Sequence, residues 1–583
     1  MAGGLHAIVP NRESDDVIPG SVAARQQTLR DRFTPWRPRT LHGVLLDAVD
    51  SFPDRPFVIT DDRTWSYAEM EEWSRRLAAG LRGTGIAQGD RIAVVMANYP
   101  EFVALKYAIS RIGAIAVPIN ILNRAQELAY LLEQSGARLL VTMARFRDLD
   151  YEAMLDDIAP GWETSGGGAA LPDLRQVIVF PGEADAIRAG ATPFSALEEF
   201  TAGGEPDIAV DPGDLADLLY TSGTTGQPKG VELTHDMLTR TAFGSVYARA
   251  FEDGHRTLFS LPMYHVFGYV EGLLSAPYVG GAIVPHTKFD AAAMLQAIER
   301  HRATDALLIP TMTLEMLRIA REQVFDLSSL HFVLASGGRA PERIWQEIHD
   351  VFGVREITTG YGMTETTAST TVTRPDDPME RLLTTNGRMR DVGPAGDPAI
   401  ANRLVDYRVI DPATGAEMPA GEMGELVARG LGVTSGYYRK PAETAAAFTA
   451  DGWLLTGDLG RIDNDGYITL LGRTKESYRC GGEQVLPSEI ENLLTGDPTI
   501  LQAHVVPIPD ERMGEVGVAF VIPRPGQTID TAALESLTRE NLARFKVPRH
   551  FIVAQESDIP VTPSGRPRKF LLSEIALKKL ELA

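Results

Sequence analysis

Short apolar runs alternate with longer amphipathic segments through the first 150 residues of the chain. Residues 91–96 (RIAVVM), 114–119 (AIAVPI) and 138–143 (RLLVTM) are apolar and rich in β-branched residues, a pattern that predicts buried strands. Residues 100–113 and 125–136, which lie between them, carry the apolar spacing of amphipathic helices. Strands and helices that alternate at this interval predict a parallel sheet with helical crossovers.

The same alternation returns later in the chain. Strands are expected at five apolar runs: 257–261, 282–286, 305–310, 331–336 and 355–362. Helices are expected at 291–301 and 341–353, and from about 400 to 470 the pattern changes to short strands at 403–411, 424–430 and 467–472. The sequence therefore predicts an α/β protein with two α/β layers followed by a small β-rich subdomain.

Polar, glycine-containing loops follow four of the later strands. They are PMYHVFG (262–268), PTMT (310–313), SGGRAP (336–341) and YGMTET (361–366). Each loop taken alone is typical of an ordinary βα turn. Because open parallel sheets bind ligands outside the carboxyl ends of their strands, four such loops in succession predict a ligand site at one edge of this sheet.

Composition and charge narrow the class of protein. The chain has 583 residues, too many for one core, and a formal net charge of −22, which argues against nucleic acid or an anionic membrane as the main partner. Its single cysteine, Cys480, excludes an internal disulfide and a multi-cysteine metal site. Neither a signal peptide nor an apolar run long enough to span a bilayer is evident, so the sequence predicts a soluble, cytoplasmic protein.

The most informative motif is YTSGTTGQPKG, residues 220–230. Its spacing differs from that of a Walker loop, and no helix follows it directly. Glycines at 223, 226 and 230 allow backbone N–H groups to turn toward an anion, while Lys229 adds a positive charge. A plain hairpin loop is the alternative, but the combination of glycines, hydroxyls and a lysine favours a phosphate cradle. The candidate phosphate-binding residues are Thr221, Ser222, Gly223, Thr224, Thr225 and Lys229.

This motif resembles the signature of the adenylate-forming superfamily, which includes acyl-CoA synthetases, aryl-CoA ligases, luciferases and peptide-synthetase adenylation domains. The resemblance extends from about Leu41 to Lys569, with six motifs in the family's order. The other segments that carry it are LPMYHVFG (261–268), ASGGRAP (335–341), YGMTE (361–365), GYYRKPAETAAAFTADGWLLTGDLG (436–460) and GRTKESYRCGGEQVLPSEIE (472–491).

The resemblance implies a reaction in two steps. A carboxylate first attacks the α-phosphate of ATP, which gives acyl-AMP and pyrophosphate, and a thiol, usually that of coenzyme A, then displaces AMP. By resemblance, Glu365 holds Mg²⁺, Thr364 donates to the α-phosphate, Tyr361 stacks on adenine, Asp458 accepts from both ribose hydroxyls and Arg473 holds the ribose and phosphate. Without the ordered motifs, Asp458 would be an ordinary turn residue and Arg473 a surface charge.

Further site residues follow from the same resemblance. His265 is expected to gate the acyl pocket against the thiol tunnel, although a lone histidine beside aromatic residues is more often packed in a core or used as a cap. Cys480 is expected to be a small loop residue rather than a nucleophile. The remaining nucleotide-binding candidates are Gly337, Gly338, Arg339, Gly362 and Met363, and the CoA-binding candidates are Arg479, Gly481 and Gly482.

The resemblance also implies the domain organisation. Residues 1–472 would form a large adenylate-binding domain, 473–475 a hinge centred on Lys475, and 476–583 a small mobile α/β domain, here called the cap. In the superfamily the cap rotates between the two half-reactions. One of its faces brings a lysine near the C-terminus to the site for adenylation, and the other brings the loop of residues 472–482 for thioester formation.

One departure from the family pattern concerns that lysine. The family's P-x-T-x-x-G-K-[IV]-x-[RK] becomes PVTPSGRPRK at residues 560–569, so Arg566 stands where the lysine is expected and Pro567 where a branched aliphatic residue is usual. A guanidinium is a longer planar fork than an ammonium, and Pro567 biases the backbone of Arg566 toward extended conformations. Lys569 matches the family's second basic position and is not expected to substitute.

Three functions remain open on the sequence alone. The favoured one is an acyl-CoA ligase that makes a thioester from acyl-AMP and CoA but adenylates poorly, with the acyl-AMP supplied by a partner adenylating enzyme. The others are a complete two-step, Mg²⁺- and ATP-dependent synthetase and a non-catalytic acyl-adenylate binder. Met263, Phe267, Met312, Leu314 and Met363 favour a bulky hydrophobic acid, and CoA rather than a carrier-protein thiol is a family-level expectation.

Overall fold

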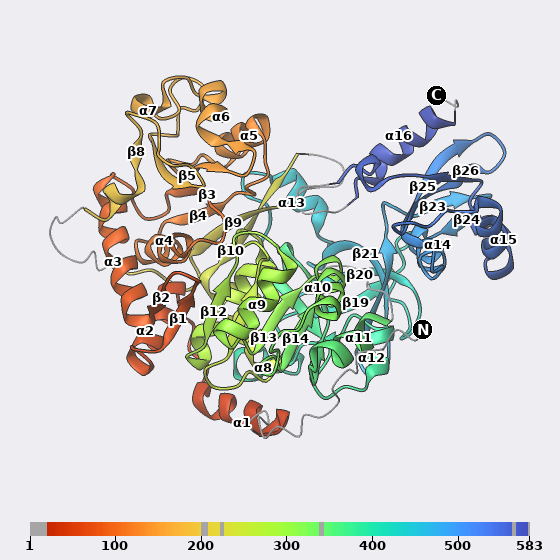
Figure 1. Cartoon of the computed structure of the whole chain (residues 1–583), viewed down its shortest axis with the longest axis horizontal. Coiled ribbons are helices and arrows are strands. Elements are labelled where there is room, and N and C mark those ends of the chain that lie inside the picture. Colours follow the sequence, from red (N-terminus) through yellow and green to blue (C-terminus); the bar gives the residue numbers. More distant parts are fainter. Residues whose placement is uncertain (1–19, 200–207, 222–226, 337–342, 562–566, 581–583) are drawn as a thin grey trace, which may run out of the picture.

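The computed structural model of the chain describes residues 20–199, 208–221, 227–336, 343–561 and 567–580. Over these residues the strands form five sheets, two of them large. Figure 1 shows the C-terminal strands and helices set apart from the rest of the molecule. The result is a large N-terminal domain and a small C-terminal domain of mixed α/β structure, which confirms the expected fold class.

The first large sheet has the order β10-β9-β4-β3-β5-β7-β8, and β6 pairs with β5. Strands β3, β4 and β5 are parallel and fully or largely buried, as the apolar runs predicted. Its strands are β3 (Arg91–Val95), β4 (Ile115–Pro118), β5 (Leu139–Phe146), β6 (Leu149–Asp150), β7 (Gln176–Gly182), β8 (Thr192–Pro193), β9 (Leu215–Thr221) and β10 (Lys229–Thr234). The associated helices are α3 (Tyr67–Gly83), α4 (Pro100–Arg111), α5 (Ala125–Ser135), α6 (Tyr151–Ile158) and α7 (Trp162–Ser165).

The second large sheet has the order β15-β14-β13-β11-β12-β1-β2. Strands β11, β13, β14 and β15 are neighbours and run parallel, so the four polar loops that follow them leave the same edge of the sheet. Its strands are β1 (Pro56–Ile59), β2 (Thr64–Ser66), β11 (Arg256–Phe259), β12 (Ala282–Pro285), β13 (Asp305–Leu308), β14 (Phe332–Ala335) and β15 (Glu356–Thr358). Its part of the chain also contains α1 (Val22–Phe33), α2 (Leu41–Ser51), α8 (His235–Ala248), α9 (Ala291–His301), α10 (Pro310–Glu322) and α11 (Arg343–Phe352).

The β-rich region follows as two small antiparallel sheets. The first contains β16 (Gly360–Met363), β17 (Ala368–Val372) and β18 (Arg388–Met389), and the second contains β19 (Asp406–Ile410), β20 (Gly424–Arg429), β21 (Leu454–Ile462) and β22 (Ile468–Arg473). Helices α12 (Met379–Thr384) and α13 (Pro441–Ala447) lie in the connections. Adjacent antiparallel strands with short apolar patterns account for the loss of helical spacing in this part of the sequence.

The C-terminal domain has a sheet and a hydrophobic core of its own. Its buried apolar residues, from Tyr478 to Ala576, form a cluster separate from the large cluster that runs from Leu29 to Ile468. The strands are β23 (Tyr478–Cys480), β24 (Glu483–Val485), β25 (Ile500–Asp510), β26 (Gly514–Pro523) and β27 (His550–Val553), and the helices are α14 (Pro487–Thr495), α15 (Thr531–Asn541) and α16 (Lys569–Lys579). Strand β22 ends at Arg473 and β23 begins at Tyr478, so the predicted hinge, residues 473–475, lies where one sheet ends and before the next begins; its role as a hinge stays a prediction.

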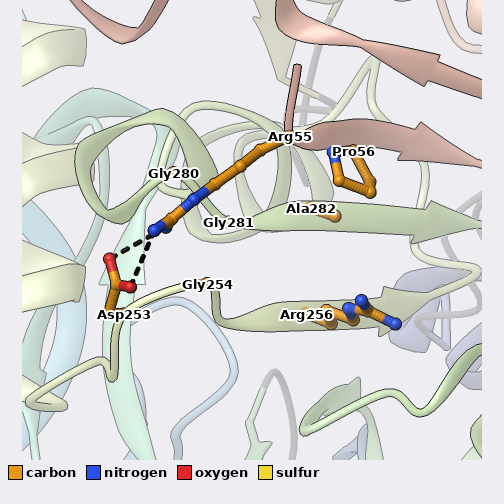
Figure 2. A pocket seen from close by; sticks show the side chains of 8 residues that line it. All are labelled: Arg55, Pro56, Asp253, Gly254, Arg256, Gly280, Gly281 and Ala282. Carbon is orange, nitrogen blue, oxygen red and sulfur yellow. Dashed lines mark hydrogen bonds and ion pairs between the residues drawn. The ribbon is translucent and has the colours of Figure 1, made fainter. Parts of the chain in front are cut away.

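A pocket of about 240 Å³ lies at the amino ends of β1, β11 and β12. Figure 2 shows Arg55 reaching across it to Asp253, with which it forms two hydrogen bonds of 2.9 and 3.0 Å. The carboxyl ends of these parallel strands, where a ligand is expected, lie at the opposite edge. This pocket is therefore distinct from the candidate active site.

In the part of the chain that the structure describes, every helix is too short or too polar to cross a bilayer.

Candidate active site

The glycine-rich motif connects two antiparallel strands. Thr221 at the end of β9 pairs with Lys229 at the start of β10, and Gly230 pairs with Tyr220. The motif is therefore a hairpin connection, and both expectations for it, hairpin and phosphate cradle, remain compatible with this topology. Several predicted residues lie outside the described residues: Ser222, Gly223, Thr224, Thr225, Gly337, Gly338, Arg339 and Arg566.

Lys229 and Glu365 both contact Tyr437, a residue that is not among the site residues predicted from the sequence. The Lys229 ammonium lies 3.9 Å from the centre of the Tyr437 ring, and the Tyr437 hydroxyl donates a 3.0 Å hydrogen bond to Glu365 Oε1. Tyr437 belongs to the GYYRKP stretch that begins the segment 436–460, so its sequence signal was present but gave no partner. The structure therefore joins the glycine-rich motif and the YGMTE motif at one place.

The YGMTE motif forms a tight turn between β16 and β17. Thr364 and Glu365 are buried there, in a short 3₁₀ turn, η4 (Thr364–Thr366). Gly362 faces Ser369 across the pair, and a Cβ at position 362 would lie 1.7 Å from the carbonyl oxygen of Ala368, so only glycine fits. Ala368 has a φ of 120°, a conformation that is costly for a residue with a side chain and is typical of functional turns.

Asp458 and Arg473 form the second part of the site. They face each other across β21 and β22, and Arg473 Nε lies 3.1 Å from Asp458 Oδ1. The Tyr361 hydroxyl donates to the other carboxylate oxygen, Asp458 Oδ2, at 2.7 Å. Asp458 is only 6% exposed, so it is a buried carboxylate with a hydrogen bond on one oxygen and an ion pair on the other, rather than a turn residue on the surface. Arg473 is paired, and the Asp458 carboxylate is the main cause that raises its pKa.

The electrostatics connect the two parts. Burial raises the pKa of Glu365, while the Tyr437 hydroxyl and the charges of Lys229 and Arg473 act in the opposite direction. Burial lowers the pKa of Lys229, and the positive charge of Lys475 lowers it further. The two carboxylates and three cations thus share one electrostatic environment, with positive charge near the place where an anionic ligand is expected.

Of the remaining large-domain and hinge candidates, two are exposed and one is half-buried. His265 is exposed in the loop after β11, where its Nδ1 accepts a 3.4 Å hydrogen bond from the Phe267 N–H. It is therefore not a packed core histidine, and the helix that follows, η2 (Phe267–Leu273), has Val266 at its N-cap position without a side-chain cap hydrogen bond. Lys475 is exposed in the turn between β22 and β23, and Met363 is half-buried next to Thr364. The gating and hinge roles of His265 and Lys475 stay predictions.

Gly481 and Gly482 form the two-residue turn of the β23–β24 hairpin. Their φ angles are 64° and 90°, so both positions have the left-handed backbone that two-residue hairpins require and glycine supplies. Arg479, exposed on β23, donates from Nη1 to the Gly482 carbonyl oxygen at 3.3 Å. Cys480 is buried, and burial raises the pKa of its thiol, as expected for a structural cysteine rather than a nucleophile.

Lys569 is held inside the C-terminal domain by two carboxylates. Its Nζ lies 2.8 Å from Glu491 Oε1 and 3.0 Å from Glu476 Oε2. Burial alone would lower the pKa of Lys569, but the two carboxylates outweigh it and the pKa is raised. Lys569 is therefore part of an ion-paired cluster at the start of α16.

The donor set fits Mg²⁺ only together with phosphate oxygens. Within the described residues, no group of three or more His, Cys, Asp or Glu side chains is arranged to hold a metal. Glu365 offers one carboxylate beside two cations. Because Mg²⁺ is commonly bound by one or two carboxylates and the phosphates of a nucleotide, Glu365 fits this use and does not fit a metal site made by the protein alone.

Comparison with known proteins identifies the family. Residues 45–438 match the AMP-binding enzyme family, and residues 489–566 match the AMP-binding enzyme C-terminal domain. The first match covers more than half of the chain, so the chain belongs to the AMP-binding enzyme family.

Two relatives are acyl-CoA synthetases or ligases by name. The putative acyl-CoA synthetase YngI of Bacillus subtilis (strain 168) is 32% identical over 559 residues, which cover 93% of this chain and 98% of the relative. A Mycobacterium tuberculosis enzyme, 3-[(3aS,4S,7aS)-7a-methyl-1,5-dioxo-octahydro-1H-inden-4-yl]propanoyl:CoA ligase, is 34% identical over 544 residues, which cover 92% of this chain and 99% of the relative.

A solved structure agrees with these matches. The o-succinylbenzoate CoA synthetase (MenE) of Bacillus subtilis, solved with the acyl-adenylate intermediate OSB-AMP, superposes with a TM-score of 0.76 at 26% identity, covering 91% of this chain and 97% of that one. The same enzyme was also solved with ATP and a magnesium ion, and that structure gives a TM-score of 0.75 at 26% identity, covering 91% and 98%. The chain is thus a member of the adenylate-forming superfamily, of the acyl-CoA ligase type.

Proposed function

We propose that this chain forms an acyl-CoA thioester from an acyl-AMP and coenzyme A, and that its ATP-dependent adenylation half-reaction is lost or very weak. The observation that carries the second part is Arg566, followed by Pro567, at the position of the family's adenylation lysine. The acyl-AMP would then come from a separate adenylating enzyme.

The described residues around Arg566 offer no replacement lysine from the same segment. Lys569, the lysine next in sequence, is bound by Glu476 and Glu491. The backbone on either side of 562–566 is also fixed, since Val561 and Pro567 form a bridge and the Arg568 N–H donates to the Pro560 carbonyl at 2.7 Å. Pro567 is therefore built into the closure of this loop, and a simple sliding of the chain would break these contacts.

In the superfamily the thioester step uses the other face of the cap, so it is not expected to depend on Arg566. The sulfur of CoA attacks the carbonyl carbon of the mixed anhydride, the bond from that carbon to the phosphate oxygen breaks, AMP leaves with the electron pair, and the thiol proton passes to solvent. Asp458 and Arg473 would hold the ribose and phosphate, Tyr361 the adenine, and Lys229 and Thr364 the phosphate. Rotation of the cap about Lys475 would bring Arg479, Gly481 and Gly482 beside the pantetheine arm, with His265 at the passage to the acyl group.

The acid is proposed to be bulky and hydrophobic. Met263 and Met312 are buried, and Phe267, Leu314 and Met363 are half-buried, around the loops that follow β11, β13 and β15. The names of the relatives support the size of the acid, because they include a bicyclic propanoate and a substituted benzoate.

A complete two-step ligase is the second candidate. It is favoured by the intact Glu365 turn, since a carboxylate suited to Mg²⁺ serves the adenylation step, in which magnesium would neutralise phosphate charge.

The test compares the two half-reactions in the unmodified protein. ATP–pyrophosphate exchange is measured with a panel of medium-chain, aromatic and polycyclic acids, and thioester formation is measured with the corresponding synthetic acyl-AMPs and CoA. The proposal expects thioester without exchange. Robust exchange with any acid identifies a two-step ligase, and tight acyl-AMP binding without thioester identifies a binder.

Variants sharpen this test. A positioned cation that acts in the transition state is typically worth about 10²–10³ in rate, so Arg566→Lys, alone or with Pro567→Ile, is expected to restore measurable exchange and leave thioester formation almost unchanged. Arg568→Lys is the matched control, because it makes the same substitution two residues away. Exchange restored equally by Arg568→Lys would contradict the assignment of position 566.

A further inference from the structure

Tyr437 touches both charged residues that the two main motifs supply. Its ring face receives the Lys229 ammonium at 3.9 Å, and its hydroxyl donates to Glu365 at 3.0 Å. Tyr437 is 8% exposed, Glu365 is 7% exposed and Lys229 is half-buried, so these contacts are partly shielded from water. A cation over a tyrosine ring is attracted by the ring quadrupole, more strongly when water is excluded.

The backbone around Tyr437 fixes the ring between the two motifs. Tyr437 forms a bridge with Val231 of β10, and the Tyr438 N–H donates to the Gly230 carbonyl at 2.8 Å. On the other side, the Thr434 N–H donates to the Glu365 carbonyl at 2.8 Å. The segment 434–438 thus spans from the second strand of the glycine-rich hairpin to the Glu365 turn, and the ring has little freedom to move away.

Lys229 and Glu365 carry opposite charges, and Tyr437 contacts both of them. Among the ion pairs of the described residues, none joins Lys229 to Glu365, although each affects the pKa of the other. Tyr437 satisfies each of them with a different part of its side chain. An ammonium stacked on a ring keeps its full charge and its N–H donors toward other partners, whereas one paired with a carboxylate is neutralised.

We propose that Tyr437 is a positioning residue that holds Lys229 apart from Glu365, so that the ammonium stays available to the phosphate of the adenylate. The ligand is the one assigned under the proposed function, so the inference rests on it. Tyr437 itself acts through Lys229 and is given no chemical role in the reaction. Removing its ring should let the lysine and the glutamate pair directly.

The experiment measures AMP binding by calorimetry, with folding checked by thermal unfolding. Tyr437→Leu is expected to weaken AMP binding about 3- to 30-fold, the range of a shielded cation–ring contact. Tyr437→Phe keeps the ring and should lose clearly less affinity than Tyr437→Leu, remaining within about 2-fold of the parent. Tyr438→Leu is the matched control: it removes the neighbouring ring while the backbone bonds stay, and it should bind AMP like the parent.

A double-mutant cycle tests whether Tyr437 affects AMP binding through Lys229 or by loosening the structure of the site. In a Lys229→Met background, Tyr437→Leu should cause almost no additional loss, since the two changes act through the same ammonium. With saturating CoA, the Tyr437→Leu change should raise the KM for acyl-AMP and leave kcat within about 2-fold. Any of three results would overturn the proposal. They are fully additive losses in the cycle, an effect in Tyr437→Phe as large as that in Tyr437→Leu, and parent-like AMP binding by Tyr437→Leu.

A substitute variant and the choice of AMP binding as the readout allow the experiment to refute the inference in every case. If Tyr437→Leu does not fold, Tyr437→Met replaces it in every arm, and Lys229→Met alone must still weaken AMP binding. Because the readout is AMP binding, it remains valid if the wild-type protein forms no thioester, so failure of the proposed function and failure of this inference are distinguishable.

Discussion

Asp458→Ala is expected to weaken AMP binding about 30- to 700-fold. An ionised carboxylate offers about four acceptor sites. Tyr361 and Arg473 use one site on each oxygen, at 2.7 and 3.1 Å, which leaves two for the two ribose hydroxyls. At about 1–2 kcal/mol for each charge-assisted bond, the loss amounts to about 2–4 kcal/mol, and about 1.4 kcal/mol corresponds to a tenfold change in Kd.

The same substitution disturbs the protein itself, and this part needs its own controls. Removal of the carboxylate leaves the buried Tyr361 hydroxyl without its acceptor, at a cost of about 1–3 kcal/mol in stability. Tyr361→Phe removes that one hydrogen bond and keeps the ring, so it isolates the structural component. Asp458→Asn keeps one acceptor oxygen and should lie between the parent and the alanine variant.

The assay is calorimetric titration with AMP at one temperature, after thermal unfolding has confirmed that each variant is folded. Binding by a folded Asp458→Ala variant within about 3-fold of the parent would falsify the ribose assignment. If Tyr361→Phe loses as much affinity as Asp458→Ala, the carboxylate acts by holding Tyr361 and the ribose contact is not needed.

Three further substitutions test other parts of the site. Gly482→Ala should slow CoA attack at least 10-fold more than Gly526→Ala. Both glycines are in the cap, have φ near +80 to +90° and have nothing within 4 Å of an added Cβ, so the backbone strain of the two substitutions is matched. Equal rates would show that Gly482 serves only the hairpin turn. Burial raises the pKa of Glu365, so the stability that this residue contributes is present below the ordinary carboxyl pKa and is lost as pH rises through the raised pKa. Glu365→Gln should therefore raise the unfolding temperature at pH 8 but not at pH 4. An equal shift of the unfolding temperature at both pH values would contradict the burial argument. Lys569→Met leaves two partly buried carboxylates unpaired and should cost about 1–3 kcal/mol at pH 7, measured by denaturant unfolding, whereas Lys579→Met, at an exposed pair on the same helix, should cost under about 1 kcal/mol.

The order of the elements, and the edge of the sheet at which the candidate site lies, could be predicted from the sequence. Apolar runs and amphipathic spacing predicted β3 to β5, β11 to β15 and the helices between them, because burial on both faces of a parallel sheet demands continuous apolar residues. The polar loops after four neighbouring strands then predicted a ligand site at one edge of the second large sheet. Local composition is sufficient for these features, since each depends on residues close together in the chain.

The partners of the site residues were decided by the tertiary structure alone. Asp458 and Arg473 became a pair through the register of two antiparallel strands, and Tyr437 reached Glu365 across 72 positions of the chain. The cluster of Lys569 with Glu476 and Glu491 likewise joins segments far apart in the sequence. Periodicity reports which face of an element is buried but not what lies opposite it. The charge environment of Glu365 and Lys229 therefore exists only once distant segments pack together and exclude water.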